Sequence, residues 1–292
     1  MTSPFADDRL VAPRGRAVEA ADHFRLPFRN RNWRGTAGNW SGAGVGSSID
    51  FQDHRPYIAG DDPRYINWQA YARTGAYTMK LYREEVSPRV DLVLDVSPSM
   101  FHRPAKAART WELFHFCLES TRRSQAAPRA WYLSEGECRE ARLEAIEQGR
   151  FELPEFKGDE RLSLRGVPWR QQALRVFISD LLDPRCGEEV FPCLSNENKT
   201  SLLLAPYCRE EEAPDWSGNV EMLDCETGEK RIQYFHSDLL RRYRNDYRRH
   251  FEMADEQARR HRILLARVPA EEDFLEALRT RALPLGAVEP WD

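Results

Sequence analysis

The chain has 292 residues, 41% of them hydrophobic, and its 43 basic and 47 acidic side chains leave a formal net charge of −4. This balance lacks the basic excess typical of proteins that bind nucleic acid or anionic membranes, so we expect neither partner. No stretch approaches the ~20 apolar residues of a membrane span, and the first sixteen residues lack the apolar segment of a signal peptide. We therefore expect a soluble, cytoplasmic protein whose core suffices for one sizeable domain and an extension.

The six cysteines are scattered through the chain, and no two of them have Cys-x-x-Cys spacing. This distribution is typical of ordinary buried or half-buried thiols in a reducing compartment. We therefore predict neither a zinc site nor a disulfide framework.

The first part of the chain divides into two segments. Residues 1–40 are rich in Arg, Asp and Pro without a clear period, which predicts a loosely ordered lead-in with one short helix near Val18–Phe24. Residues 41–89 contain a glycine- and serine-rich run and then a polar, aromatic block, which we expect to pack as an arm on the main domain. The glycine run, Gly42–Ser48, lacks both a preceding strand and the Gly-Lys-Ser/Thr ending of a phosphate-binding loop.

Residues 90–285 alternate between apolar runs and helical patterns. The runs predict strands that are covered on both faces, as in a parallel sheet; they are Val90–Val96, Leu174–Ile178, Ser201–Ala205 and Ile263–Val268. Helical periodicity covers residues 105–122 and 237–261, with Ser237 as the predicted N-cap, and residues 220–235 read as a hairpin. We predict one α/β domain with a doubly wound, mostly parallel sheet and an N-terminal extension.

Two predicted strands end in carboxylates. The first ends in Asp95-Val-Ser97-Pro-Ser99 and the second in Ile178-Ser179-Asp180. Because ligands bind outside the carboxyl ends of parallel strands, these oxygens are candidate ligands for Mg²⁺ or Mn²⁺. The alternative is that the serines cap the following helix while Asp95 accepts hydrogen bonds from backbone amides.

The Asp95-x-Ser97-x-Ser99 pattern resembles the metal-ion-dependent adhesion site of von Willebrand factor A domains. The block from Asp50 to Gly75, with its Gly60-Asp-Asp-Pro-Arg64 turn, is similar to the hallmark of the bacterial domain-of-unknown-function family 58. That family consists of A-like proteins commonly paired with MoxR-type AAA+ ATPases. The later Asp224–Glu229 segment also matches its pattern, so the resemblance runs from about Gly42 to about Gly286.

The resemblance implies a von Willebrand factor A-like fold over residues 90–285. It also implies a non-catalytic adaptor that works with a MoxR-type AAA+ ATPase in the assembly or maturation of client proteins. Carried over to this chain, Asp95, Ser97 and Ser99 are the expected metal ligands and Asp180 an outer-shell carboxylate. The family pattern has a threonine in a loop between these strands. Here Gly158–Leu164 contains none, and Ser163 is the substitute hydroxyl.

The block from Asp50 to Gly75 has two interpretations that do not exclude each other. Its arginines and acids can form bidentate pairs, which would make a salt-bridged clasp that holds the arm on the domain, and its aromatic residues can cover an edge of the sheet. Alternatively the block is a docking surface for the ATPase. The candidate partner-binding residues are Arg55, Asp61, Asp62, Arg64, Trp68 and Arg73.

Enzyme functions find little support in the sequence. It contains neither the Gly-x-Ser-x-Gly of a serine hydrolase nor a His-Glu-x-x-His zinc motif. We therefore expect no catalysis. The alternatives are a metal-dependent hydrolase or phosphatase, with His102 as its base, and a scaffold whose metal site has decayed.

Overall fold

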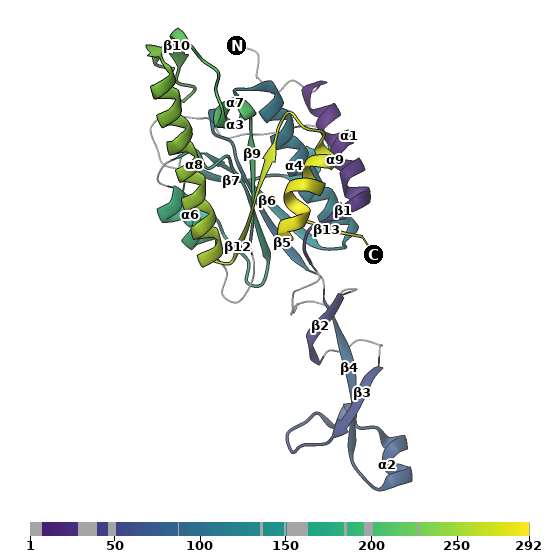
Figure 1. Ribbon diagram of the computed structural model, residues 1–292. Coiled ribbons are helices and arrows are strands. Elements are labelled where there is room, and N and C mark those ends of the chain that lie inside the picture. The colour runs from purple at the N-terminus through teal and green to yellow at the C-terminus, as the bar shows by residue number, and fades with distance from the viewer. Residues whose placement is uncertain are drawn as a thin grey trace. The chain divides into compact units, whose positions relative to one another are not determined.

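The computed structural model describes residues 8–28, 40–45, 51–86, 88–134, 137–148, 150, 163–183, 186–195, 201–226 and 228–291. The chain forms two compact units (Figure 1), which are described separately. One comprises residues 1–27, 89–124 and 128–292, and the other comprises residues 28–88 and 125–127. Among the described residues, no helix is both long and apolar enough to cross a membrane.

The larger unit is built on a six-stranded sheet with the spatial order β12-β9-β8-β5-β6-β7. The strands are β5 (Arg89–Asp95), β6 (Ala127–Ser134), β7 (Glu137–Glu140), β8 (Leu174–Ile178), β9 (Ser201–Tyr207) and β12 (Ile263–Pro269). The pairs β12/β9, β9/β8 and β8/β5 are parallel, whereas β6/β7 is antiparallel. The predicted mixed α/β class with a mostly parallel sheet is therefore confirmed.

Helices cover both faces of this sheet (Figure 1), which explains why its central strands read as continuous apolar runs. On one side lie α6 (Cys186–Leu194) and α8 (Ser237–Arg260), and on the other α1 (Asp8–His23), α4 (Pro104–Arg123) and α9 (Phe274–Ala277). Helix α8 buries only Tyr247, Phe251, Ala254 and Ala258, which recur at three and four residues and pack on the sheet.

Shorter elements complete the unit. They are β1 (Phe24–Arg25), α3 (Pro98–Phe101), α5 (Leu143–Glu147), η2 (Leu164–Gly166), α7 (Arg209–Glu212), β10 (Gly218–Leu223), β11 (Lys230–Phe235), η3 (Leu278–Ala282), η4 (Leu283–Leu285) and β13 (Glu289–Pro290). Strands β10 and β11 form the predicted hairpin. Strand β1 pairs with β13 and so joins the two ends of the described chain.

The start of the chain is more ordered than the sequence predicted. Where we expected a loose lead-in with a short helix near Val18–Phe24, residues 8–23 form one helix that packs on α4 and α9. Its contact face consists of small side chains, Ala17, Ala20 and Ala21, all fully buried. Alanine at this helical spacing allows close approach, yet it carries too little apolar signal to stand out among the charged neighbours.

The smaller unit is a three-stranded antiparallel sheet with the order β2-β4-β3. Its elements are β2 (Trp40–Val45), β3 (Phe51–Pro56), η1 (Pro63–Tyr65), α2 (Trp68–Thr74) and β4 (Thr78–Val86). Asn67 caps α2 by accepting the backbone N–H of Ala70 at 3.1 Å, and Gly75 ends it with a φ of 69°. The expected arm is thus a folded unit, and its packing on the α/β domain stays a prediction.

Candidate functional site

The strand order of the large sheet reverses between β5 and β8. Numbered by their order in the chain, the six strands follow the spatial order 6-5-4-1-2-3. In such sheets the connections leave the first and fourth strands in opposite directions, and the crevice at their carboxyl ends is the usual place for a ligand. Asp95 is the last residue of β5, and Ser179 and Asp180 directly follow β8, so all three lie at this edge.

Asp95 is buried, and both of its carboxylate oxygens accept hydrogen bonds. Oδ1 accepts the backbone N–H of Ser97 at 2.9 Å, and Oδ2 accepts the hydroxyl of Ser179 at 2.7 Å. The hydroxyl oxygens of Ser97 and Ser99 lie 3.1 Å apart. These contacts bring the predicted Asp95, Ser97 and Ser99 into one group, joined from the next strand by Ser179.

The alternative interpretation, that the serines cap the helix and Asp95 accepts backbone amides, is correct for Asp95 and wrong for Ser97. Asp95 does accept a backbone amide, as that alternative predicted. Ser97, however, is the N-cap residue of α3 without a side-chain hydrogen bond to the helix. Its hydroxyl instead contacts the hydroxyl of Ser99, which leaves oxygen lone pairs of both serines for another ligand.

The charge of Asp95 is poorly compensated. Burial, together with the negative charge of neighbouring Asp180, raises its pKa to about 7, although hydrogen bonds from Ser179 and Ser97 act in the opposite direction. Within the described ranges, no cationic side chain forms an ion pair with Asp95. A bound cation would supply the charge that this position lacks.

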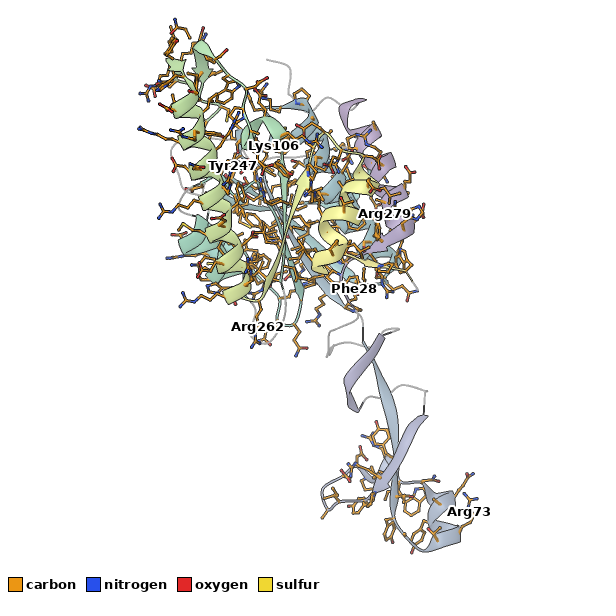
Figure 2. All side chains as sticks on the ribbon, viewed as in Figure 1. Phe28, Arg73, Lys106, Tyr247, Arg262 and Arg279 are labelled. Atoms are coloured by element: carbon orange, nitrogen blue, oxygen red, sulfur yellow. The ribbon has the colours of Figure 1, made fainter. Side chains whose placement is uncertain are left out.

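Asp180 has a different environment because a lysine neutralises it. Lys106, labelled in Figure 2, has a fully buried side chain, and its Nζ lies 2.7 Å from Asp180 Oδ2 and 2.7 Å from Glu211 Oε1. Asp180 Oδ1 accepts the backbone N–H of Leu182 at 3.1 Å. Although burial lowers the pKa of Lys106, the charges of Asp180 and Glu211 raise it above its usual value, so the lysine stays charged.

A strained turn follows Asp180. Leu181 has a φ of 59°, the left-handed conformation that side chains other than glycine rarely adopt. Its N–H donates to Ser179 Oγ at 3.2 Å, and its carbonyl oxygen lies 2.7 Å from Nε2 of His250 on α8. Since a carbonyl only accepts, this histidine nitrogen carries the proton. Strain of this kind is typical of functional sites, and the Leu181 N–H contacts the same Ser179 hydroxyl that donates to Asp95.

Ser163 is not part of the described Asp95 group. It precedes η2, where its hydroxyl accepts the backbone N–H of Arg165 at 3.4 Å. No hydrogen bond in the described ranges links it to Asp95, Ser97 or Ser99. The rest of the loop in which the threonine was expected, from Gly158 to Leu162, lies outside the described residues. The role of Ser163 as a substitute hydroxyl stays a prediction.

The predicted ion pairs of the smaller unit form within its own turn. Arg55 makes two parallel hydrogen bonds to Asp61, at 2.7 and 2.6 Å, and holds the pKa of that carboxyl below its usual value. Arg64 also pairs with Asp62, where its Nε and Nη2 both donate to Oδ2, at 2.9 and 2.6 Å. These pairs stabilise the turn between β3 and η1. Asp50, also considered for such pairs, lies outside the described residues.

Aromatic side chains gather beside this turn and remain accessible. Tyr71 and Tyr77 stack with ring centroids 4.4 Å apart, and Trp68 meets both rings edge-on. Trp68 is 58% exposed and Tyr77 is 48% exposed, while Arg73 extends from α2 into solvent (Figure 2). We call Trp68, Tyr71, Arg73 and Tyr77 the aromatic surface. Aromatic residues and arginine are enriched in protein interfaces.

Sequence reasoning missed four residues that shape the site: Lys106, Ser179, Glu211 and His250. Ser179 had a usable signal, since it stands beside Asp180 at a strand end as Ser97 stands beside Asp95. Lys106 had a weaker signal, because a cation in the first turn of a helix opposes the helix dipole and needs a compensating partner. Glu211 and His250 occur in charged helices that carry no such signal.

One comparison with known proteins found a match. A family model described as "Protein of unknown function DUF58" matches residues 53–119, which run from β3 through the aromatic surface and β5 into α4. No curated protein and no solved structure matches the chain. The matched residues include Asp95, Ser97, Ser99 and Lys106, and the match supports the predicted placement of the chain in the DUF58 family.

Proposed function

We propose that this protein is a non-catalytic adaptor that binds a divalent cation, Mg²⁺ or Mn²⁺, at Asp95 and uses it to hold a carboxylate of a partner protein. The observation that carries this proposal is the clustering of Asp95, Ser97 and Ser99 at the reversal of strand order. A von Willebrand factor A-like topology for the α/β unit belongs to the same proposal. The strand order, with Asp-x-Ser-x-Ser after its first strand, supports it.

The oxygens at this edge fit a hard cation with an open coordination sphere. Among the described residues, no group of three or more His, Cys, Asp or Glu side chains is placed to hold a metal ion. Coordination at Asp95 would therefore rely on one carboxylate, the hydroxyls of Ser97 and Ser99, and water. Mg²⁺ accepts such a set, because it usually keeps several waters and binds through one or two carboxylates.

The lysine at Asp180 supports an outer position for that carboxylate. Asp180, unlike Asp95, already pairs with a buried cation, Lys106, at 2.7 Å, so Asp180 would orient the edge rather than touch the ion. The ion would then keep net positive charge. This favours recruitment of a partner's Asp or Glu as the remaining ligand.

The partner we propose is a MoxR-type AAA+ ATPase together with a client protein. The family match includes the aromatic surface as well as Asp95, which supports a shared role for both regions. Exposed aromatic residues beside an arginine, such as those around Arg73, are typical docking groups. A reaction mechanism has less support, because His250, a histidine close to the edge, is engaged with the carbonyl of Leu181.

The decisive experiment is a calorimetric titration of the metal-free protein with Mg²⁺ and Mn²⁺. We expect saturable binding to the wild type and to Ser217→Ala, which changes an exposed serine outside the site, and none to Asp95→Ala. A pulldown and ATPase assay with a MoxR-type ATPase then tests the partner. Stimulation that requires Asp95 supports the adaptor, whereas absence of both metal binding and stimulation supports a scaffold. Metal-dependent turnover of a phosphate ester that is lost in Asp95→Ala would instead identify a hydrolase.

A further inference from the structure

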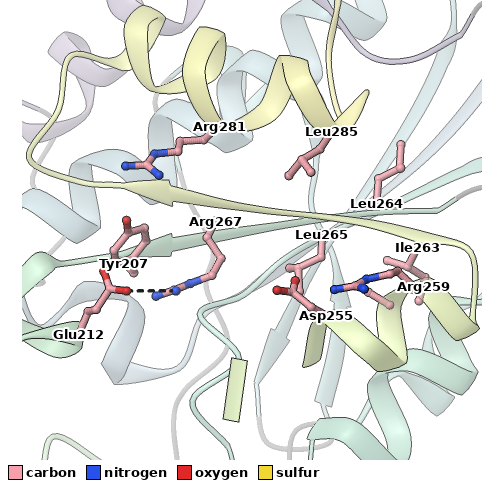
Figure 3. A pocket seen from close by; sticks show the side chains of 11 residues that line it. Tyr207, Glu212, Asp255, Arg259, Ile263, Leu264, Leu265, Arg267, Arg281 and Leu285 are labelled. Atoms are coloured by element: carbon pink, nitrogen blue, oxygen red, sulfur yellow. Dashed lines mark ion pairs between the residues drawn. The ribbon is translucent and has the colours of Figure 1, made fainter. Parts of the chain in front are cut away.

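A cavity of about 500 Å³ lies along the outer edge of β12 (Figure 3). Strand β12 is the last strand of the sheet order, with β9 on one side, and no described strand pairs with its other side. Three consecutive residues, Ile263, Leu264 and Leu265, line the cavity. Because consecutive strand residues point to opposite faces, contact with all three means that the cavity follows the strand's edge.

Helical segments form the walls of this cavity. Helix α8 supplies Asp255, Ala258 and Arg259, and the C-terminal segment supplies Arg281 and Leu285 from the opposite side (Figure 3). Strand β12 is therefore the floor of a groove. The outward backbone N–H and C=O groups of an edge strand are the groups to which another strand can pair.

Arg267 is a rigid donor at one end of the groove. Its guanidinium lies over three aromatic rings, 3.8 Å from the centroid of Phe251, 4.3 Å from that of Tyr207 and 5.3 Å from that of Tyr247. The closest ion-pair contact, to Glu212, is 3.6 Å, which is too long for a hydrogen bond. Its Nη2 donates to the hydroxyl of Tyr247 at 2.8 Å, while its buried Nε–H has no acceptor in the described part of the chain. Arg267 thus retains donor capacity in a fixed orientation.

The side chains of the other two arginines of the groove form no hydrogen bond within the described residues. Arg281 lies 3.7 Å from Glu272, again beyond hydrogen-bond distance. For the side chain of Arg259, the described residues include no hydrogen bond or ion pair. With Glu212 and Asp255 as the carboxylates of the lining, three guanidiniums face two acids and leave an excess of one positive charge.

We propose that this groove binds an extended peptide segment of another protein, which adds as a seventh strand beside β12 and places an acidic side chain among Arg259, Arg267 and Arg281. The outer edge of β12 offers backbone hydrogen bonds to the peptide, and the arginines select an acidic side chain of the peptide. The lining from Ile263 to Arg267 spans four residue steps, or about 13 Å at ~3.3 Å per residue, which fits four or five peptide residues. Leu264, Leu265 and Leu285 offer apolar contacts for the intervening side chains.

The test is a selection of random displayed heptapeptides on the full-length protein in the presence of EDTA. We expect enrichment of sequences that combine β-branched residues with Asp or Glu. The enriched peptides are then synthesised with a fluorescent label for polarisation measurements, and hydrogen exchange of β12 is measured with and without peptide. Added strand pairing predicts slower exchange of the amides within Ile263–Val268.

The variant Arg259→Glu/Arg281→Glu reverses the charge of the groove, and we expect at least tenfold weaker peptide binding. Arg260→Glu/Arg279→Glu makes the same change in charge on exposed side chains that do not line the groove, and we expect less than a twofold effect. Thermal unfolding checks that both variants fold. Asp95→Ala should bind peptide like the wild type, which separates this inference from the proposed metal site.

Three results would overturn the inference. The first is no enrichment of any peptide over a blank surface. The second is equal binding to both double variants. The third is binding without slower exchange in β12, together with equally tight binding of free N-acetylglutamate, because that result assigns the cavity to small carboxylates.

Discussion

Lys106 and Asp180 form a buried ion pair across 74 residues of sequence, with 2.7 Å between Nζ and Oδ2. The pair connects the first turn of α4 with the end of β8, and Glu211 extends it to α7 at the same distance. One lysine thus bridges two carboxylates that follow two different strands. Asp95, the next acid along this edge, has no such partner in the described residues, which is why the two acids are assigned different roles.

The Lys106→Met substitution should destabilise the protein strongly. It leaves two largely buried carboxylates without their cation, and loss of one partner of a buried pair costs about 3–5 kcal/mol. Urea unfolding at pH 7.5 measures the change in free energy. Lys230→Met is the matched control, because Lys230 pairs with Glu221 on the surface at 2.6 Å with 69% of its side chain exposed, and such pairs contribute about 0–1 kcal/mol. Equal effects of the two substitutions would contradict the structural role of Lys106.

Ser179→Ala should weaken the proposed metal binding without abolishing the fold. The hydroxyl of Ser179 donates to Asp95 Oδ2 and fixes the carboxylate's orientation. Loss of such a supporting hydrogen bond typically reduces metal affinity by about 10–100-fold. Calorimetric titration with Mn²⁺ measures the change, and Ser217→Ala, at an exposed serine, serves as the control. An unchanged affinity in Ser179→Ala would place the ion elsewhere.

Trp68→Ala should weaken binding of the proposed ATPase partner by about tenfold or more, as expected for an exposed aromatic anchor. Trp68 lies in the smaller unit, so the unfolding of the α/β unit should not change. Surface plasmon resonance with an immobilised MoxR-type ATPase measures the affinity. Tyr234→Ala, which removes a 61% exposed aromatic side chain from the β10–β11 hairpin, is the control. A larger loss for Tyr234→Ala would move the interface to the hairpin.

The sequence predicted four of the six strands of the large sheet, and helices α4 and α8, because their signals are local, but it missed strand β6 and most of helix α1. Strand β8 has the predicted bounds, and α4 and α8 differ from prediction by a residue or two. Ser237 proved to be the first helical residue rather than the N-cap, which is His236. Strand β7 was missed because its four residues are polar and mostly exposed, as suits the edge of a sheet.

Only the part of the candidate site that is encoded by a short motif at one strand end could be predicted. Asp95, Ser97 and Ser99 are close in sequence, so their grouping followed from a short motif. The contact of Ser179 with Asp95 and the pair between Lys106 and Asp180 join segments 84 and 74 residues apart. No local pattern encodes such pairings, since they depend on strand order and on how α4 packs against the sheet. The groove beside β12 is equally non-local, because it needs α8 and the C-terminal segment together.

His115 predicts a measurable pH dependence of stability. Burial, with a contribution from the charge of Arg14, lowers its pKa from 6.5 to about 4 in the folded protein. Between these values the unfolded chain binds a proton that the folded protein excludes, so this contribution is complete above pH 6.5 and is lost as the pH falls toward 4. At pH 5 the loss amounts to about 2 kcal/mol, from ~1.36 kcal/mol for each pH unit below 6.5.

The His115→Gln variant lacks the titrating group. Between pH 7.5 and pH 5, the free energy of unfolding of this variant should therefore fall by about 2 kcal/mol less than that of the wild type. Urea unfolding at both pH values measures the difference, with His236→Gln, at an exposed histidine, as the control. If His115→Gln and the wild type lose the same stability over this range, His115 is protonated in the folded protein. The burial of this side chain on α4 then does not exclude its charged form.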